Sequence, residues 1–158
     1  MKNSLQISLN KTLKLTNVVI RNVLPEELEK YQTTIQNMEN YIRIKGNQPV
    51  GPLVQYTKSF VNDEGELDMV IKFMRQSTTY ITHKEEDYNT KPVLRVPNCM
   101  YCRYIGSEDS LKFAYDKIGV TAFEKGIRLK GESYTVFVDN NEEEEYIVAD
   151  VFMEREDG

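Results

Sequence analysis

The sequence predicts an α+β fold made of two copies of one β-α-β-β unit, and the spacing of its glycines is the first reason. Gly46 and Gly126 each stand where a predicted helix ends. Gly51 and Gly131 each open the following strand, and the interval between them equals the interval between the first two glycines. Recurrence at a fixed offset is the sequence signature of a repeated unit. We therefore expect a duplication within the chain.

Element order and a pair of apolar residues support the same conclusion. A strand, a helix and two further strands follow one another in residues 13–83 and again in residues 91–154. Phe73-Met74 and Phe152-Met153 close the two copies, at an interval one position shorter than that of the glycines. Two copies related by a pseudo-twofold axis can join their strands into one antiparallel sheet with both helices on one face. We predict this arrangement, in a single domain that spans residues 1–158.

The first copy begins with residues 13–23, where β-branched residues predict a strand. Pro25, followed by two acids, is typical of a helix start. Strands are predicted over 53–61 and 67–75 with a turn between them, and 77–83 is either a further short strand or a connector. Apolar residues recur along the helix at spacings of three and four, as in an amphipathic helix of about five turns: Leu28, Tyr31, Ile35, Met38 and Ile42.

The second copy follows a charged segment, 84–90, that is the best candidate for the link between the halves. A strand is predicted over 93–104, followed by a helix over 107–125 with Ser107 as its N-cap. Two strands are predicted next, over 133–138 and 146–153, with the turn at 139–141. One apolar face is expected along the helix: Leu111, Tyr115, Ile118 and Ala122.

Composition excludes several classes of protein. The net charge of −5 and the pI near 5.1 argue against a nucleic-acid binder, whose footprint is a basic patch. No apolar run approaches the roughly 18 residues of a membrane helix, and no export leader is recognisable. Cys99 and Cys102 are three apart in a strand-like run, so they should point to opposite faces as two unrelated, reduced thiols. With His83 as the only histidine we expect no metal and no cofactor, and we expect a cytoplasmic protein.

The sequence resembles the GyrI-like superfamily, the effector-binding domains of bacterial multidrug-responsive transcription activators. The resemblance covers residues 13–154, although each motif is short. In the first half only Gly51-Pro52 and Tyr56 match, in place of the Glu-x-Tyr motif of the second half. The second half carries the full pattern: Pro97 with Tyr104-Ile105-Gly106, then Ala114-Tyr115, Gly126 with Gly131, Glu132-Ser133-Tyr134, and Ala149-Asp150-Val151-Phe152.

The resemblance implies a pocket that binds bulky, flat, often cationic hydrophobic compounds between aromatic walls, with a buried glutamate that offsets their charge. Carried over to this sequence, that glutamate is Glu132, with Asp150 as the alternative. Two departures bear on the choice: Asp150 stands where the family more often has glutamate, and Glu154 stands where it has proline. The candidate ligand-binding residues are Glu132, Tyr134, Tyr146, Asp150, Tyr56, Tyr104, Tyr115 and Phe137.

The residues themselves are compatible with this implication. Ten tyrosines and six phenylalanines are enough to line a pocket in a chain that has no tryptophan. Aromatic faces attract cations, and a buried carboxylate beside them favours a cationic guest. The alternative reading of any single tyrosine is a core aromatic with a solvated hydroxyl. For Glu132 the alternative is a rim position or a structural hydrogen bond.

Three functions follow from the resemblance. The first is a stand-alone protein that senses or sequesters drug-like molecules. The second is a hydrolase that opens the cyclopropane rings of genotoxic natural products, with Glu132, Tyr134 and Tyr146 as its catalytic residues. The third is an interaction module that inhibits DNA gyrase or partners a regulator. About a dozen residues precede the first predicted strand, too few for a helix-turn-helix, so we expect no direct DNA binding.

Overall fold

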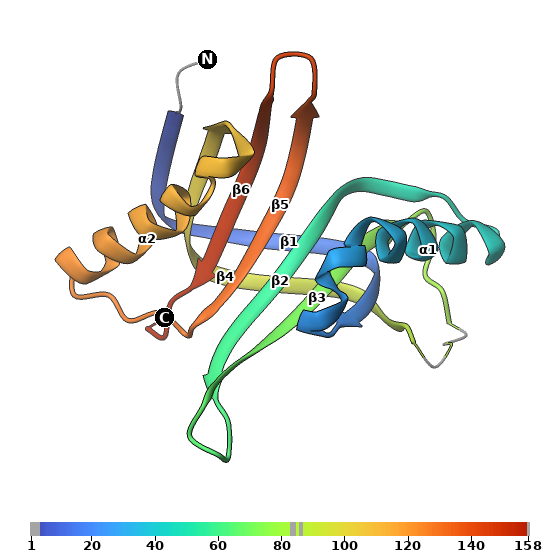
Figure 1. The fold of residues 1–158 in the computed structure, drawn as a ribbon, viewed down its shortest axis with the longest axis horizontal. Coiled ribbons are helices and arrows are strands. Elements are labelled where there is room, and N and C mark those ends of the chain that lie inside the picture. Colours follow the sequence, from blue (N-terminus) through green and yellow to red (C-terminus); the bar gives the residue numbers. More distant parts are fainter. Residues whose placement is uncertain (1–3, 83–84, 86, 158) are drawn as a thin grey trace. The chain divides into compact units, whose positions relative to one another are not determined.

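The computed structural model describes residues 4–82, 85 and 87–157. It has the predicted α+β class, with strands that pair antiparallel and two α-helices (Figure 1). Two short 3₁₀ helices, η1 and η2, lead into the α-helices. The elements are β1 Ser4–Val23, η1 Pro25–Lys30, α1 Tyr31–Ile44, β2 Pro49–Val61, β3 Leu67–Ser77, β4 Asn89–Gly106, η2 Glu108–Ser110, α2 Lys112–Glu124, β5 Glu132–Asn141 and β6 Tyr146–Glu154.

The chain forms two compact units that do not coincide with the two sequence copies. One unit is Lys14–Arg95, and the other combines the residues up to Leu13 with those from Val96 onward. The division falls inside β1 and inside β4, so each of these long strands contributes to both units. The sequence predicted two continuous copies, 13–83 and 91–154, and did not predict that the units share strands.

In the unit Lys14–Arg95, β3 pairs with β1 on one side and with β2 on the other. Helix α1 packs on one face of these strands. Met38 and Ile42, both fully buried, belong to one apolar cluster with Ile71 and Phe73 of β3. Burial of apolar side chains at about 25 cal/mol per Å² is the main force that holds the helix there. The predicted apolar face is therefore confirmed for Ile35, Met38 and Ile42. It is wrong for Leu28 and Tyr31, which are 37% and 42% exposed.

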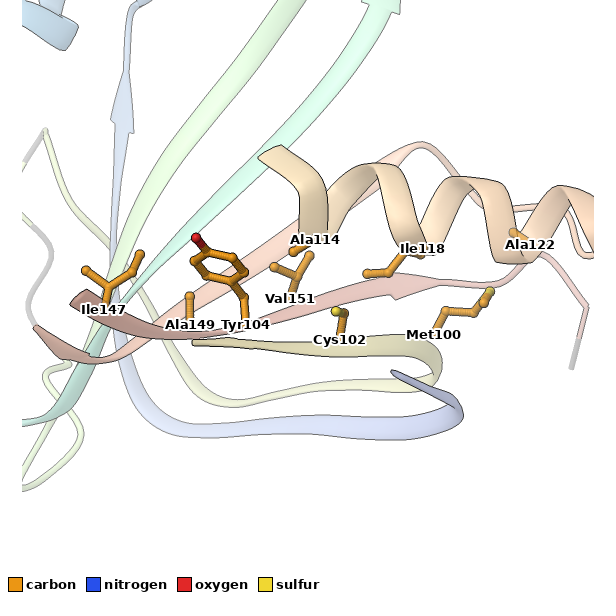
Figure 2. Packing of buried hydrophobic residues seen from close by; sticks show 9 residues of the cluster. All are labelled: Met100, Cys102, Tyr104, Ala114, Ile118, Ala122, Ile147, Ala149 and Val151. Atoms are coloured by element: carbon orange, nitrogen blue, oxygen red, sulfur yellow. The ribbon is translucent and has the colours of Figure 1, made fainter. Parts of the chain in front are cut away.

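In the other unit, β6 pairs with β4 and with β5. Figure 2 shows Ala114, Ile118 and Ala122 of α2 turned toward the strands, where they pack with Cys102 of β4 and Val151 of β6. Leu111 and Tyr115 pack at the edge of the same cluster. The predicted apolar face of this helix is confirmed.

The paired glycines are confirmed as repeated backbone features. Gly46 and Gly126 follow the two helices with φ of +81° and +67°. Gly51 and Gly131 have φ of +73° and +87° at the openings of β2 and β5. These values lie in the left-handed region, which side chains with a Cβ rarely adopt. The same unusual conformation therefore recurs at both members of each pair.

The third pair used to predict the duplication is out of register by one position. Val54 lies opposite Met74 in the first copy, and Tyr134 lies opposite Phe152 in the second. Met74, and not Phe73, therefore corresponds to Phe152. Phe73 packs against α1, whereas Phe152 lies on the face that points away from α2. A shift of one residue along a strand moves a side chain to the other face, so the Phe-Met match was a coincidence of composition.

A better third marker is a pair of asparagines that sequence patterning missed. Asn17 in β1 and Asn98 in β4 recur at nearly the interval of the glycine pairs, and both have positive φ, +51° and +58°. Asparagine tolerates this conformation better than most residues. The side-chain amide of Asn17 donates to the carbonyl of Ser77, and that of Asn98 donates to the carbonyl of Asp157. Each asparagine thus joins its long strand to the end of a closing strand or to the residues that follow it.

Several predicted boundaries are wrong. The first strand begins at Ser4, well before residue 13, and the first helix begins with one 3₁₀ segment. Residues 139–141 belong to β5, so the turn lies at 142–145, where four consecutive glutamates stay solvated. Of the two alternatives for residues 77–83, the connector agrees with the structure, because 78–82 form no strand; Ser77 ends β3, and His83 lies outside the described residues. Among the described residues, no helix is long and apolar enough to cross a membrane.

Both cysteines are buried and carry no disulfide. Cys102 belongs to the cluster under α2, and Cys99, three residues earlier, lies on the opposite face of β4. Burial is the main cause that raises the pKa of Cys99 to about 11 and also raises the pKa of Cys102. Both therefore stay protonated at neutral pH, as expected for unrelated core thiols.

Candidate ligand-binding site

The strands β4, β6 and β5 have one face under α2 and one face that points away from it. Residues that lie directly opposite each other in an antiparallel pair share a face. Tyr101, Phe152 and Tyr134 are opposite one another in this way, across the three strands. Arg103 and Asp150 form the next row. Together with Glu132, two residues before Tyr134, we call this set the acid–aromatic face: Tyr101, Arg103, Glu132, Tyr134, Asp150 and Phe152.

The three rings form a row across the strands. Neighbouring strands lie about 4.8 Å apart, so the row from Tyr101 to Tyr134 is about 10 Å wide. The rings of Tyr101 and Phe152 have centroids 5.0 Å apart and planes inclined at 53°. This tilted geometry is one that aromatic pairs favour. Tyr134 and Phe152 are buried and Tyr101 is half-buried.

Asp150 is already paired within the protein. Its carboxylate accepts two hydrogen bonds from the Arg103 guanidinium, Nε to Oδ1 at 2.7 Å and Nη2 to Oδ2 at 2.9 Å. The hydroxyl of Tyr101 donates a third, at 2.8 Å. The Asp150 side chain is 13% exposed, so this bidentate pair is partly shielded from water. The negative charge of Asp150 is therefore offset by Arg103, and it raises the pKa of that guanidinium.

Glu132 and Tyr134 are two residues apart in β5, so they lie on the same face of the strand. Glu132 is half-buried, and Tyr134 is 8% exposed. Burial, followed by the negative charges of Glu132 and Glu154, raises the pKa of Tyr134 to about 12. Glu154 forms an ion pair with Lys130 at 2.8 Å. At neutral pH the Tyr134 phenol therefore keeps its proton.

The two raised phenol pKa values lead to a prediction about alkaline pH. Burial and the hydrogen bond to Asp150 raise the pKa of Tyr101 to about 12, like that of Tyr134, from an ordinary 10.0. The unfolded chain loses these protons first, so the free energy of unfolding should fall as pH rises from about 10 to about 12. In a titration of the native protein followed by phenolate absorbance, Tyr134→Phe and Tyr101→Phe should each remove one late ionisation. Loss of an ionisation near pH 10 instead would show that the phenol is not shielded.

The structure separates the candidate residues into two groups. Tyr104 is fully buried under α2, and its hydroxyl donates to the carbonyl of Ser107. Tyr115 of α2 bonds to the hydroxyl of Thr135, and burial raises its pKa. Phe137 lies opposite Ala149, a residue of the same core. These three aromatics are thus on the helix side, away from Glu132.

Tyr146 is also distant from Glu132 along the strands, and Tyr56 belongs to the other compact unit. Tyr146 lies opposite Asn141, at the far end of the β5–β6 hairpin from Glu132. Tyr146 is at one end of β6, and the other end of β6 lies near Glu132. At the rise of a strand, these two ends are about 26 Å apart. Glu132 and Tyr146 therefore do not meet as a catalytic pair. Tyr56 belongs to the unit Lys14–Arg95, where the ammonium of Lys72 lies 5.4 Å from its ring centroid.

Tyr101, Arg103 and Phe152 were missed as site residues. Tyr101 directly follows Cys99 and Met100 in a strand-like run, so no polar pattern marks it. The register of β4 against β6 is what places Tyr101 beside Asp150. Within the described part of the chain, no group of three histidine, cysteine or acidic residues could hold a metal ion.

No protein-family model and no curated protein matches this sequence. Solved structures do match it. The crystal structure of the EcmrR C-terminal domain is 14% identical, with a TM-score of 0.61 over 98% of this chain and 97% of that chain. A cryo-EM structure of an EcmrR–DNA complex gives a TM-score of 0.67 at 13% identity. The match covers 98% of this chain and 57% of that chain, so this chain spans little more than half the length of that one.

A third match is SAV2435 in a structure bound to tetraphenylphosphonium. It is 8% identical, with a TM-score of 0.50 over 99% of this chain and 95% of that chain. At identities this low, the likeness describes the fold and not the chemistry. The chain therefore shares the α+β fold of the EcmrR C-terminal domain, in agreement with the GyrI-like fold that its motifs resemble.

Proposed function

We propose that this protein binds bulky hydrophobic cations, as a module that senses or sequesters drug-like molecules. The observation that carries the proposal is the acid–aromatic face, which joins a row of three rings to the half-buried carboxylate of Glu132. A row about 10 Å wide suits a ligand with several aromatic rings. The fold shared with SAV2435, whose structure contains such a cation, supports the same class of ligand.

Glu132 lies beside a buried ring, which makes it our candidate for the acid that offsets the positive charge of the ligand. Its charge acts on the Tyr134 phenol. A cation stacked on the Tyr134 ring would therefore lie close to the Glu132 carboxylate, where ring and charge act together. Asp150 is held in the bidentate pair with Arg103, so its charge is offset within the protein. We assign the offset of the ligand's charge to Glu132 because its charge acts on the phenol of the ring that the ligand would cover.

Binding of tetraphenylphosphonium, measured by isothermal titration calorimetry, tests this assignment. Glu132→Gln keeps the shape of the side chain and removes its charge, so the dissociation constant should rise about tenfold or more. Glu144→Gln, in the exposed turn between β5 and β6, makes the same change of net charge away from the face and should bind like wild type.

The outcomes separate the function from the residue. If wild type does not bind the cation, the proposed ligand class is wrong. If wild type binds and the Glu132 and Glu144 variants match it, the ligand class stands and the assignment to Glu132 is wrong. A Tyr134→Leu variant adds an independent measure, because loss of the ring should also weaken binding.

A further inference from the structure

Tyr101 is the ring of the acid–aromatic face that is best fixed for holding a cation. Its hydroxyl is held by Asp150 at 2.8 Å, and its ring packs against Phe152. Because the phenol donates to a carboxylate, electron density on the ring increases, and the attraction of a cation to the ring face increases with it. Tyr101 is half-buried, so part of the ring can be reached from solvent.

A cation of the protein itself already lies on this ring. The ammonium of Lys11 in β1 is 4.8 Å from the Tyr101 ring centroid, well within the distance of a cation–π contact. Lys11 is exposed, and it belongs to the same compact unit as Tyr101. The guanidinium of Arg155 donates to the carbonyl of Leu9 at 3.1 Å, which ties this part of β1 to the end of the chain. The backbone near Lys11 is therefore held in place beside the Tyr101 ring.

We infer that Tyr101 is a ligand-binding ring of this site, and that Lys11 is a resident cation which the ligand displaces. The inference rests on the proposed function, and it adds that Lys11 competes with the ligand for the Tyr101 ring. A lysine ammonium is compact and strongly hydrated, and its flexible stem leaves the ring at little cost. A bulky phosphonium or quaternary ammonium is poorly hydrated and covers more of the ring, so it gains more from the same surface.

The competition defines which ligands the site favours. Cations without N–H donors lose little hydration when they move onto the ring, so they should displace Lys11 easily. Small primary ammonium ions resemble the lysine and gain nothing over it. The predicted class is therefore bulky, aromatic or quaternary monocations, with primary alkylamines excluded.

The test uses residues 1–158 and the tetraphenylphosphonium titration. Lys11→Met keeps most of the side-chain length and removes the charge, so the affinity should rise about two- to fivefold. Lys14→Met changes the net charge equally at an exposed position of the same strand and controls for long-range electrostatics. In the background of Tyr101→Leu, the further change Lys11→Met should give no gain, because the ring for which the two cations compete is gone.

Each outcome decides the inference. A gain in affinity for Lys11→Met that Lys14→Met lacks, and that disappears with the Tyr101 ring, supports it. Binding by wild type with equal affinity in the Lys11→Met and Lys14→Met variants overturns this inference and leaves the proposed function in place. Absence of binding by wild type and by all variants overturns both. Circular dichroism of each variant establishes that the fold is retained.

Discussion

Replacing Ile118 by alanine is expected to lower the free energy of unfolding by about 2–5 kcal/mol. Ile118 is fully buried, and it lies at the centre of the α2 face that packs on β4 and β6 (Figure 2). Its helix neighbours in the cluster, Ala114 and Ala122, are small, so they cannot fill the space left behind. The loss therefore combines the transfer of the side chain with an unfilled cavity. Urea denaturation followed by circular dichroism measures it.

Val120 provides the matched control on the same helix. It is 55% exposed, so Val120→Ala removes methyl groups that water already reaches. Its effect should stay within about 0.5 kcal/mol. Equal losses for the two variants would mean that α2 is not held by the face the structure buries, and the packing of this unit would need revision.

The second large effect is expected from Glu39→Gln. Glu39 of α1 forms an ion pair with Arg75 of β3, and the two side chains are 21% and 14% exposed. Breaking a fully buried pair costs about 3–5 kcal/mol, so a loss of about 2–4 kcal/mol is expected here. The Nε atom of Arg75 is already buried without a hydrogen-bond partner among the described residues, which makes the remaining contact with Glu39 more important. Thermal and urea unfolding report the change.

Two further variants show whether the loss comes from an unpaired charge. Glu29→Gln, exposed in η1, makes the same chemical change and should be close to neutral. The double variant Glu39→Leu with Arg75→Met replaces both charges by apolar groups and should recover most of the stability. A double variant as unstable as Glu39→Gln would attribute the loss to packing rather than to charge.

Much of the fold follows from local patterns. The spacing of Leu111, Ile118 and Ala122 determined which face of α2 is buried, because a helix has one period and one apolar stripe. Gly46 and Gly126 marked both helix ends, because few residues other than glycine take a positive φ there. Signals of this kind depend on a few neighbouring residues, so a sequence displays them directly.

Strand register was harder to predict, because it depends on residues far apart in the chain. The Phe-Met pairs looked like a repeat, yet Phe73 lies on the face that packs against α1 and Phe152 lies on the face that points away from α2. The turn placed at residues 139–141 is strand, because these residues pair with β6 beyond an irregularity between Phe137 and Asp139. A bulge adds a residue without leaving a clear mark in composition.

The candidate site was predictable only in part. Glu132 and Tyr134 could be placed together because they form the Glu-x-Tyr motif of the family that the sequence resembles. Tyr101 and Arg103 of β4 join the face through pairing with β6, a strand much further along the chain, which no local pattern encodes. Tyr104 and Tyr115 pack in the core, whereas the Lys11 ammonium lies over the ring of Tyr101. Aromatic content alone did not distinguish these two roles.

The sharing of β1 and β4 between the two units has a consequence for dividing this protein into fragments. If the chain is cut between the repeats, residues 4–13 go with one fragment, but the unit they complete is in the other. Residues 89–95 are separated from their unit in the same way. Neither fragment then contains every strand segment of its unit, so we expect neither to fold alone and a mixture of the two to recover the fold.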